Sequence, residues 1–272
     1  MIIKIINFFI NNFIKIFSFK CLMPFYKFLI HFSLKASGYK NFGNFHITGE
    51  TFFLKSIKKF NIKNSIDIGA NVGDYSRKII EITNSNVLAF EIMKKSFNKL
   101  KLLEVEFTGK FQCFNIGLSD KKETKFIYFQ DSTSQLASLE KNINKFNYLK
   151  KKINKKKIQL HTFDQFALDK KKFFKYGIDF VKIDTEGSDY KVLLGSLKTI
   201  KKYKPKFIQF EMNWHYLFSG INLFIISQKF TNYKVYKILP YNLGIVEVDP
   251  THPDNNLFHL SNFVLVRKDI KM

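Results

Sequence analysis

Cysteine is scarce in this 272-residue sequence, which contains only Cys21 and Cys113. Two distant cysteines cannot form a disulfide framework, and they do not have the spacing of a zinc site. The sequence therefore excludes a small disulfide-stapled secreted domain and a cysteine-rich metal module. A reducing compartment, the cytoplasm, is the expected location.

Carboxylates are absent from the first thirty-odd residues, which are strongly apolar and carry lysines. Polar residues interrupt every stretch that approaches the roughly 20 residues of a membrane-spanning helix. These are Lys4, Asn7, Asn11, Asn12, Lys15 and Lys20. No small-residue cleavage site follows, so a signal peptide is not expected.

Residues 1–43 are instead predicted to form an apolar, basic, helical N-terminal extension. One interpretation is an arm that packs on the core or mediates self-association with a second subunit, and we favour it slightly. The other is an interfacial helix that makes a peripheral contact with anionic lipid at the inner face of a membrane.

Acidic residues are few throughout, with 22 Asp and Glu against 45 Lys and Arg, and the formal net charge is +23. Such a charge raises encounter rates with nucleic acid, anionic lipid or acidic sugars. Much of the lysine stands in the runs Lys150–Lys157 and Lys170–Lys172, which are typical of solvated loops or helix faces. A nucleic-acid site more often interleaves arginine with aromatic residues. A small-molecule or glycan acceptor is therefore the first choice of partner, and nucleic acid is the second.

Hydrophobic residues make up 46% of the sequence, enough for one substantial domain, which we place at residues 44–272. Short apolar runs alternate there with segments of helical period. The predicted strands are 65–70, 86–91, 111–118, 125–130, 178–184, 206–212, 233–239 and 262–267. The predicted helices are 74–83, 94–106, 188–202 and 221–230, and residues 131–158 are expected to be a loop or an irregular helical insertion. This alternation predicts a doubly wound α/β fold, with a mostly parallel central sheet and helices on both faces.

Glycines stand where the first predicted strand meets the first helix, in the run DIGANVGD at residues 67–74. There the backbone must turn sharply and admit a ligand. The third glycine of the dinucleotide motif G-x-G-x-x-G is missing. Asp67 would repel a diphosphate but could hold the ammonium of a methionine moiety. Glu91 ends the next strand, where a carboxylate can accept hydrogen bonds from both ribose hydroxyls. These features favour S-adenosyl-L-methionine over a dinucleotide.

Six segments resemble, in order, the FkbM family of S-adenosylmethionine-dependent methyltransferases: DIGANVGDYS, AFE, NIGLSD, TFDQF, FVKIDTEGSDYKVLLGS and FIQFE. The resemblance runs from about Glu50 to about Glu211, and KIDTEG at residues 182–187 is its most family-specific part. Members of the family typically carry proline after the ribose-binding glutamate, whereas Ile92 and Met93 follow it here.

The resemblance implies a Rossmann-like class I methyltransferase fold and an O-methyltransferase that acts on a sugar, a glycan or a natural-product-type hydroxyl. It also implies the residues that contact the cofactor. These are Asp67, Gly69, Asn71, Gly73 and Glu91, with Ser119 and Asp120 near the adenine.

Polar side chains end two neighbouring central strands: Asp184 and Glu186 follow one, and Glu211, Asn213 and His215 follow the next. Ligands in such sheets bind outside the carboxyl ends of the strands, so these groups should converge near the transferred methyl group. Methyl transfer to a hydroxyl needs alignment and removal of a proton. Asp184, Glu186, Glu211 and His215 are therefore the candidate catalytic residues.

The division of roles among them stays open. His215 suits a general base because histidine titrates near neutrality, and it is equally well explained as a rim residue beside Trp214. Asp184 or Glu186 could serve instead in a buried setting. No metal is expected, although Asp184, Glu211 and Asn213 could together hold magnesium as oxygen ligands. Separately, Asp164 is predicted to be a helix N-cap.

Two other functions are left open. An RNA methyltransferase fits the charge, but the sequence lacks the Pro-Pro-aromatic motif of adenine N-methylation and the Pro-Cys nucleophile of cytosine chemistry. A ribose-methylating Lys-Asp-Lys-Glu set is not excluded. The third reading is a non-catalytic, membrane-associated protein that retains the cofactor fold, against which the intact Asp67, Glu91 and Asp184 argue.

Overall fold

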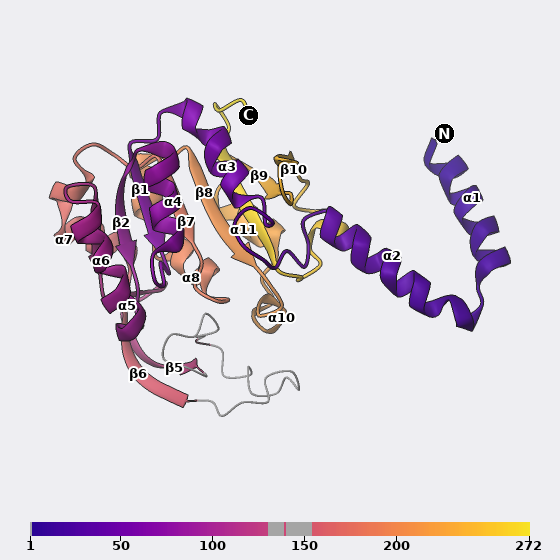
Figure 1. The fold of residues 1–272 in the computed structure, drawn as a ribbon, viewed down its shortest axis with the longest axis horizontal. Coiled ribbons are helices and arrows are strands. Elements are labelled where there is room, and N and C mark those ends of the chain that lie inside the picture. The colour runs from indigo at the N-terminus through magenta and orange to yellow at the C-terminus, as the bar shows by residue number, and fades with distance from the viewer. Residues whose placement is uncertain (1, 130–138, 140–153) are drawn as a thin grey trace.

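The computed structural model of the chain describes residues 2–129, 139 and 154–272, which form a main body and an N-terminal arm that projects from it (Figure 1). The arm consists of helices α1 (Ile2–Phe17) and α2 (Met23–Ala36). Every residue from Lys4 to Cys21 is exposed, and α2 buries none of its residues. The expectation that the arm packs on the core is therefore wrong for α1, and in α2 Leu34 packs against the core only partly buried.

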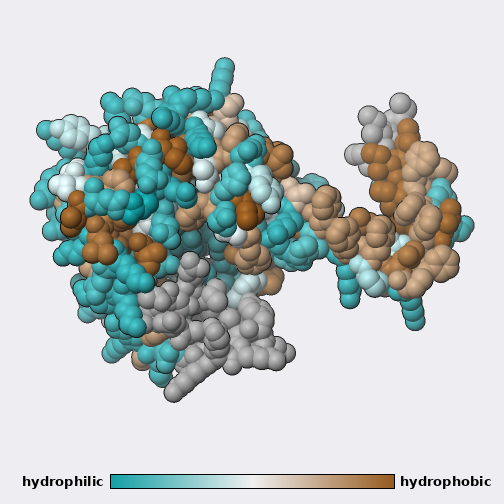
Figure 2. Space-filling model, in the orientation of Figure 1, coloured by the Kyte–Doolittle hydropathy of each residue, from teal (hydrophilic) through white to brown (hydrophobic). Residues whose placement is uncertain are grey.

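The arm differs in surface character from the main body. In the space-filling view it is mostly hydrophobic, whereas the visible face of the main body is mostly hydrophilic (Figure 2). Among the described residues, no helix is both long enough and apolar enough to cross a membrane. The division of the chain into units at residue 43 stays a prediction.

The main body is built on a sheet that, within the described residues, has eight strands in the order β10-β9-β11-β8-β7-β1-β2-β3. The strands are β1 (Asn64–Ile68), β2 (Asn86–Phe90), β3 (Phe111–Phe114), β7 (Phe180–Ile183), β8 (Phe207–Met212), β9 (Tyr233–Ile238), β10 (Ile245–Glu247) and β11 (Ser261–Arg267). Strands β3, β2, β1, β7 and β8 are parallel, and β11 runs antiparallel between β8 and β9. The chain leaves β1 in one direction toward β3 and returns on its other side at β7. This reversal opens a crevice at the carboxyl ends of β1 and β7.

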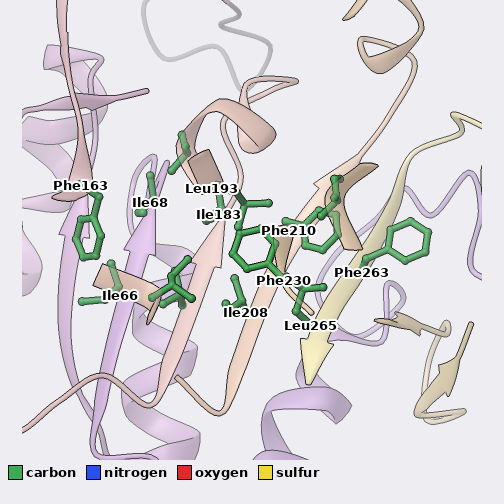
Figure 3. Packing of buried hydrophobic residues seen from close by; sticks show 14 of the residues in the cluster. Ile66, Ile68, Phe163, Ile183, Leu193, Ile208, Phe210, Phe230, Phe263 and Leu265 are labelled. Carbon is green, nitrogen blue, oxygen red and sulfur yellow. The ribbon is translucent and has the colours of Figure 1, made fainter. Parts of the chain in front are cut away.

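Helices cover both faces of this sheet because strand residues alternate between two hydrophobic cores. One core joins β1, β7 and β8 to the helices α7 (Phe163–Asp169), α8 (Asp189–Leu194), α9 (Leu197–Tyr203) and α11 (Leu223–Lys229). Figure 3 shows Ile66, Ile183 and Ile208 of neighbouring strands in this core. The other core packs α3 (Glu50–Ile57), α4 (Asp74–Thr83), α5 (Lys94–Leu100) and α6 (Leu102–Glu106) against residues such as Val87 and Ala89. The predicted doubly wound α/β architecture is confirmed.

A second, smaller sheet is an addition that the sequence patterns did not predict. It contains β4 (Gly117–Leu118), β6 (Asn154–His161) and β5 (Glu123–Phe129), in that order. The predicted strand 111–118 therefore divides, because the chain leaves the main sheet after Phe114 and pairs with β6 instead. Residues 154–158, expected to be loop, belong to β6. The rest of the predicted insertion lies outside the described residues, except for residue 139.

Two predicted helices are also divided. The helix predicted at 94–106 is α5 and α6, and the helix predicted at 188–202 is α8 and α9. Asp164 explains the second division, because its carboxylate accepts the backbone N–H groups of Lys198 and Thr199 (3.1 and 2.7 Å) at the start of α9. Thr162, not Asp164, is the N-cap of α7 and accepts the N–H of Gln165. The predicted capping role of Asp164 is therefore found at α9, not at α7, where Asp164 lies in the first turn. A short helix, α10 (Tyr216–Ser219), follows β8.

Candidate active site

A cavity of about 510 Å³ opens at the carboxyl ends of β1, β2 and β7. Its walls come from the loops that follow these strands, from the small sheet and from the segment between the arm and α3. The volume lies in the range of small-molecule sites. Of the predicted site residues, six line the cavity: Gly69, Asn71, Glu91, Asp184, Glu186 and Glu211.

Glu91 and Asn71 form one polar part of the wall. Glu91 Oε2 accepts the backbone N–H of Asn71 (2.8 Å), and Oε1 accepts that of Met93 (2.6 Å). Burial raises the pKa of the Glu91 carboxyl, and the two N–H donors oppose that rise. Each carboxylate oxygen can accept a second hydrogen bond. Within the described chain, the buried Oδ1 of Asn71 has no hydrogen-bond partner. The pair therefore offers acceptors to hydroxyl donors in the cavity.

An apolar section of the wall adjoins Glu91. It is made of Ile92, Met93, Ile116, Leu118, Ile127 and Leu160. The predicted adenine neighbours Ser119 and Asp120 are not among the lining residues. Ser119 is fully buried, its Oγ bonds the Asp120 carboxylate (2.9 Å) and its N–H bonds His161. The apolar section suits a flat aromatic ring. It is formed by the loop after β2, by Ile116 and by the small sheet, and not by Ser119 or Asp120.

The two predicted glycines serve chain packing. Gly69 has a positive φ of 79°, and a side chain there would overlap the backbone oxygen of Asp184. Gly73 has a φ of 96°, begins α4 as its N-cap, and lies against Leu100 and Leu103. Gly69 lines the cavity and Gly73 does not. Both positions need glycine for close approach of the chain, a role consistent with a tight strand-to-helix turn.

Asp67 does not itself line the cavity, and its contact with a methionine ammonium stays a prediction. It is completely buried, because alternation in β1 turns it toward α4. There its Oδ2 accepts the hydroxyl of Ser76 (2.5 Å), and its Oδ1 pairs with the Lys182 ammonium (3.4 Å). Asp67 therefore holds Lys182, a cavity-lining residue, in place.

Lys182 also pairs with Asp184 (3.4 Å), and its ammonium lies over the Tyr75 ring. Burial alone would lower the pKa of Lys182. The carboxylates of Asp67, Asp184 and Glu50 outweigh burial and raise that pKa above its usual value. Lys182 is therefore a fixed positive charge beside an acidic group of side chains.

That acidic group consists of Asp184, Glu186 and Glu211, which line one cavity as predicted. Burial raises the pKa of Glu211 well above its ordinary value, and the charges of Asp184, Glu186 and Asp189 raise it further. Burial and the charge of Asp184 also raise the pKa of Glu186 well above its ordinary value. Glu186 has a positive φ of 52°, which is uncommon for a residue with a side chain. Carboxyls with raised pKa values in a cavity are suited to proton transfer.

Asn213 and His215 are buried but do not line the cavity. The Asn213 amide nitrogen donates to Glu211 Oε1 (2.7 Å), and its oxygen accepts the backbone N–H of His215 (3.0 Å). The His215 ring stacks on Trp214 with centroids 3.8 Å apart. The structure thus places His215 behind the acidic group. In the magnesium alternative, the Asn213 oxygen would bind the ion in addition to accepting the backbone N–H of His215. The described residues contain no group of three His, Cys, Asp or Glu arranged as a metal site.

Sequence reasoning missed the segment from Asn41 to Glu50, which forms part of the cavity wall. The buried Glu50 accepts hydrogen bonds from the Thr48 hydroxyl (2.6 Å) and the Gln209 amide (2.7 Å). Gln209 in turn accepts the Tyr75 hydroxyl (2.5 Å). One signal was available, because Glu50 is the first carboxylate of the sequence and begins a helix.

Asp189 is a second missed residue, completely buried beneath the acidic group. Its Oδ1 accepts the N–H of Thr185, and within the described chain its Oδ2 has no partner. Burial and the charge of Asp184 raise the pKa of Asp189 to about 8. The folded protein therefore keeps Asp189 protonated at a pH where the unfolded chain has lost that proton.

The free energy of unfolding is expected to fall as pH rises between about 4 and about 8, by at most about 1.4 kcal/mol per pH unit for this group. Asp189→Asn should remove that share of the slope, because asparagine mimics the protonated acid and does not titrate. Urea denaturation of both proteins at pH 5 and pH 8 measures the difference. Parallel pH profiles would contradict a protonated Asp189.

Comparison with known proteins agrees with the resemblance seen in the sequence. A family model described as the methyltransferase FkbM domain matches residues 67–235, more than half of the chain. None of the curated proteins compared with the chain matches it.

Several solved structures are similar in fold. An FkbM methyltransferase from Methylobacillus flagellatus is 13% identical with a TM-score of 0.45, and the match covers 75% of this chain and 44% of that one. A dimethyladenosine transferase from Plasmodium falciparum is 11% identical, with a TM-score of 0.41 and coverage of 81% and 62%. A ribosomal protein L11 methylase from Lactobacillus delbrueckii is 11% identical, with a TM-score of 0.40 and coverage of 84% and 81%. The chain thus spans less than half the length of the Methylobacillus protein.

The sheet order, with one antiparallel strand inserted beside β8, and the helices on both faces confirm the predicted Rossmann-like class I methyltransferase fold. The family match includes the turn at Gly69, the carboxylate Glu91 and the acidic group at the ends of β7 and β8. The chain belongs to the FkbM methyltransferase family.

Proposed function

We propose that this methyltransferase uses S-adenosyl-L-methionine and methylates a hydroxyl oxygen of a sugar, glycan or natural-product-type acceptor. The observation that carries the proposal is the composition of one cavity. Its wall joins the Glu91–Asn71 pair and an apolar section to three carboxylates, Asp184, Glu186 and Glu211. A nucleoside cofactor and a hydroxylated acceptor need these two kinds of surface side by side.

The residues present fit the cofactor. Glu91 would accept hydrogen bonds from the ribose hydroxyls, and the apolar section would hold the adenine. The Asn71 oxygen, which has no hydrogen-bond partner within the described residues, would accept a further donor. When bound, S-adenosyl-L-methionine supplies an electrophilic methyl group on a sulfonium. The acidic group suits that positive charge. Among the described residues, Lys182 forms an ion pair with one of its carboxylates, Asp184.

The chain's own part in the reaction is to align the acceptor and take its proton. Glu211 or Glu186 would accept the proton that the acceptor hydroxyl loses when its oxygen is methylated. Their raised pKa values make them stronger bases than ordinary carboxylates. Asp184 would accept a hydrogen bond from a neighbouring hydroxyl, and the ion pair with Lys182 would keep Asp184 oriented.

The proposed acceptor class follows from the negative charge of the side chains that line the cavity. Carboxylates accept hydrogen bonds from hydroxyls, and the polar side chains of Asn41, Thr48 and Asn262 also line the cavity. The same carboxylates would repel a phosphate of an RNA backbone. This local charge opposes the RNA alternative, although the net charge of the whole chain is positive.

Glu91→Ala is expected to weaken binding of S-adenosylhomocysteine by about 1.5–3 kcal/mol, the usual worth of hydrogen bonds to a charged group. Isothermal titration calorimetry measures the loss. Glu81→Ala is the matched control, because Glu81 lies half exposed on α4 and should leave affinity unchanged. Thermal unfolding of each variant separates lost contacts from lost folding. Tight binding of NAD by the parent protein would contradict the cofactor assignment.

A further inference from the structure

The N-terminal arm exposes large apolar side chains along its whole length. They are Ile5, Ile6, Phe8, Phe9, Ile10, Phe13, Ile14, Ile16, Phe17, Phe19, Met23, Phe25, Phe28, Leu29, Ile30 and Phe32. Scattered apolar residues are normal on a protein surface, but a continuous patch of this size marks an interaction site. Figure 2 shows the arm as a hydrophobic projection set apart from the main body.

Most polar residues of α1 and α2 lie in stripes, and Asn12 and Ser33 lie outside them. In α1, Lys4, Asn7, Asn11 and Lys15 recur at three- and four-residue steps, which places them on one side of the helix. In α2, Lys27, His31 and Lys35 recur every four residues. The remaining circumference of each helix is largely apolar. A wide apolar face with a narrow basic stripe is typical of helices that lie in a membrane interface.

The charge of the arm has a single sign. Its charged side chains are Lys4, Lys15, Lys20, Lys27 and Lys35, and no Asp or Glu precedes Glu50. Two arms packed on each other would bring lysines together with no carboxylate in either arm to pair with them. An anionic lipid surface provides both an apolar layer and the opposite charge.

The root of the arm is fixed to the main body. Tyr39 is buried, its hydroxyl donates to the backbone oxygen of Asp254 (2.7 Å), and Lys237 lies over its ring. The N–H of Asn41 bonds to Leu260. Cavity-lining residues begin at Asn41 itself. The arm is therefore continuous with the cavity wall, with no linker between them.

From these observations we propose that residues 2–36 dock the protein onto an anionic lipid bilayer. The apolar faces of α1 and α2 enter the boundary between headgroups and acyl chains, and the lysines contact anionic headgroups. The proposal does not depend on which acceptor is methylated, because it rests on the arm alone.

Co-sedimentation of the full chain with vesicles tests the proposal. The protein should pellet with mixed phosphatidylcholine–phosphatidylserine vesicles, and weakly with phosphatidylcholine alone. The triple variant Phe9→Ser, Phe13→Ser and Phe17→Ser should lower partitioning at least about tenfold, because it removes apolar area from the docking face opposite the polar stripe of α1. All three residues are exposed, so the main body should fold as before. The matched control, Asn7→Ser, Asn11→Ser and Asn12→Ser, changes the same helix outside that face and should partition like the parent.

The charge contribution has its own pair of variants. Neutralising Lys4, Lys15 and Lys20 with glutamine should lower binding to the anionic vesicles by about fivefold per lysine. The comparison variant neutralises the exposed Lys155, Lys156 and Lys157 of β6 and should bind like the parent. Equal loss in both would mean that net charge alone drives adsorption, and the proposal would be wrong. Equal pelleting of the Phe→Ser variant and the parent would also overturn it. A third result would overturn it as well. In that case the parent protein stays in the supernatant as a dimer, and a variant that lacks residues 1–36 is a monomer.

Discussion

Glu211→Gln is expected to lower kcat by roughly 10²–10⁴-fold, the usual cost of losing a general base, with S-adenosylhomocysteine affinity nearly unchanged. Glutamine keeps the shape of the side chain and its hydrogen bond with Asn213, but it cannot take a proton. Single-turnover rates and calorimetry of the same protein measure the two quantities. S-adenosylhomocysteine is the right probe because it is uncharged at sulfur, so losing a carboxylate does not weaken it electrostatically.

The pH profile gives an independent readout of this residue. The base acts when ionised, so kcat/KM should fall as pH drops through its pKa. Burial raises the pKa of Glu211, and the fall should therefore begin at a higher pH than for an ordinary glutamate. The same reasoning applies to Glu186→Gln. His215→Asn is the comparison, since His215 lies outside the cavity. If His215→Asn abolishes turnover while both glutamine variants remain active, the base has been misassigned.

Gly69→Ala should destabilise the protein by about 2–5 kcal/mol, the sum of a positive-φ penalty and a steric overlap. The added methyl group would overlap the backbone oxygen of Asp184, and backbone cannot rotate out of the way as a side chain can. Gly177→Ala separates the two contributions. Gly177 has nearly the same φ, 82° against 79°, but nothing lies within 4 Å of its added carbon. Its substitution should cost only about 1–2 kcal/mol.

Urea denaturation of the parent and both variants gives the comparison. Equal destabilisation by the two substitutions would mean that the conformation of Gly69 matters and its contact with Asp184 does not. A stable Gly69→Ala protein would show that the turn can move away from β7.

Local pattern was enough to predict seven of the eight described strands of the main sheet, all except β10, and several of its helices. Helix α4 begins and ends at the predicted residues, because Gly73 and Asn84 both adopt left-handed backbone conformations at its ends. Other predicted helices and strands are divided in the structure. Those divisions depend on contacts between residues far apart in the sequence, which a local sequence pattern does not reveal. Helix α9 begins where Asp164, more than thirty residues earlier, accepts its first N–H groups. The small sheet likewise depends on pairing between segments far apart in the sequence.

Site residues that directly follow a strand were placed correctly from the sequence. Residues within a strand were harder to place, because the alternation of side chains decides which face of the sheet they reach. Glu91 and Glu186 follow strands and reach the cavity. Asp67 lies within β1, where alternation with Ile66 and Ile68 turns it to the opposite face, and this could have been read from the strand itself. Glu50 could not be placed, because it reaches the cavity only through packing of α3 against the sheet.

The contact between Gly69 and Asp184 has a consequence for how two ligands would share this site. The turn after β1 and the turn after β7 touch backbone to backbone, and each lines a different part of one cavity. A ligand that shifts one turn must shift the other. Cofactor and acceptor affinities are then linked, and thermodynamic reciprocity requires each ligand to change the affinity of the other by the same factor. Measuring S-adenosylhomocysteine affinity with and without a candidate acceptor would therefore reveal true acceptors before any methylated product is detected.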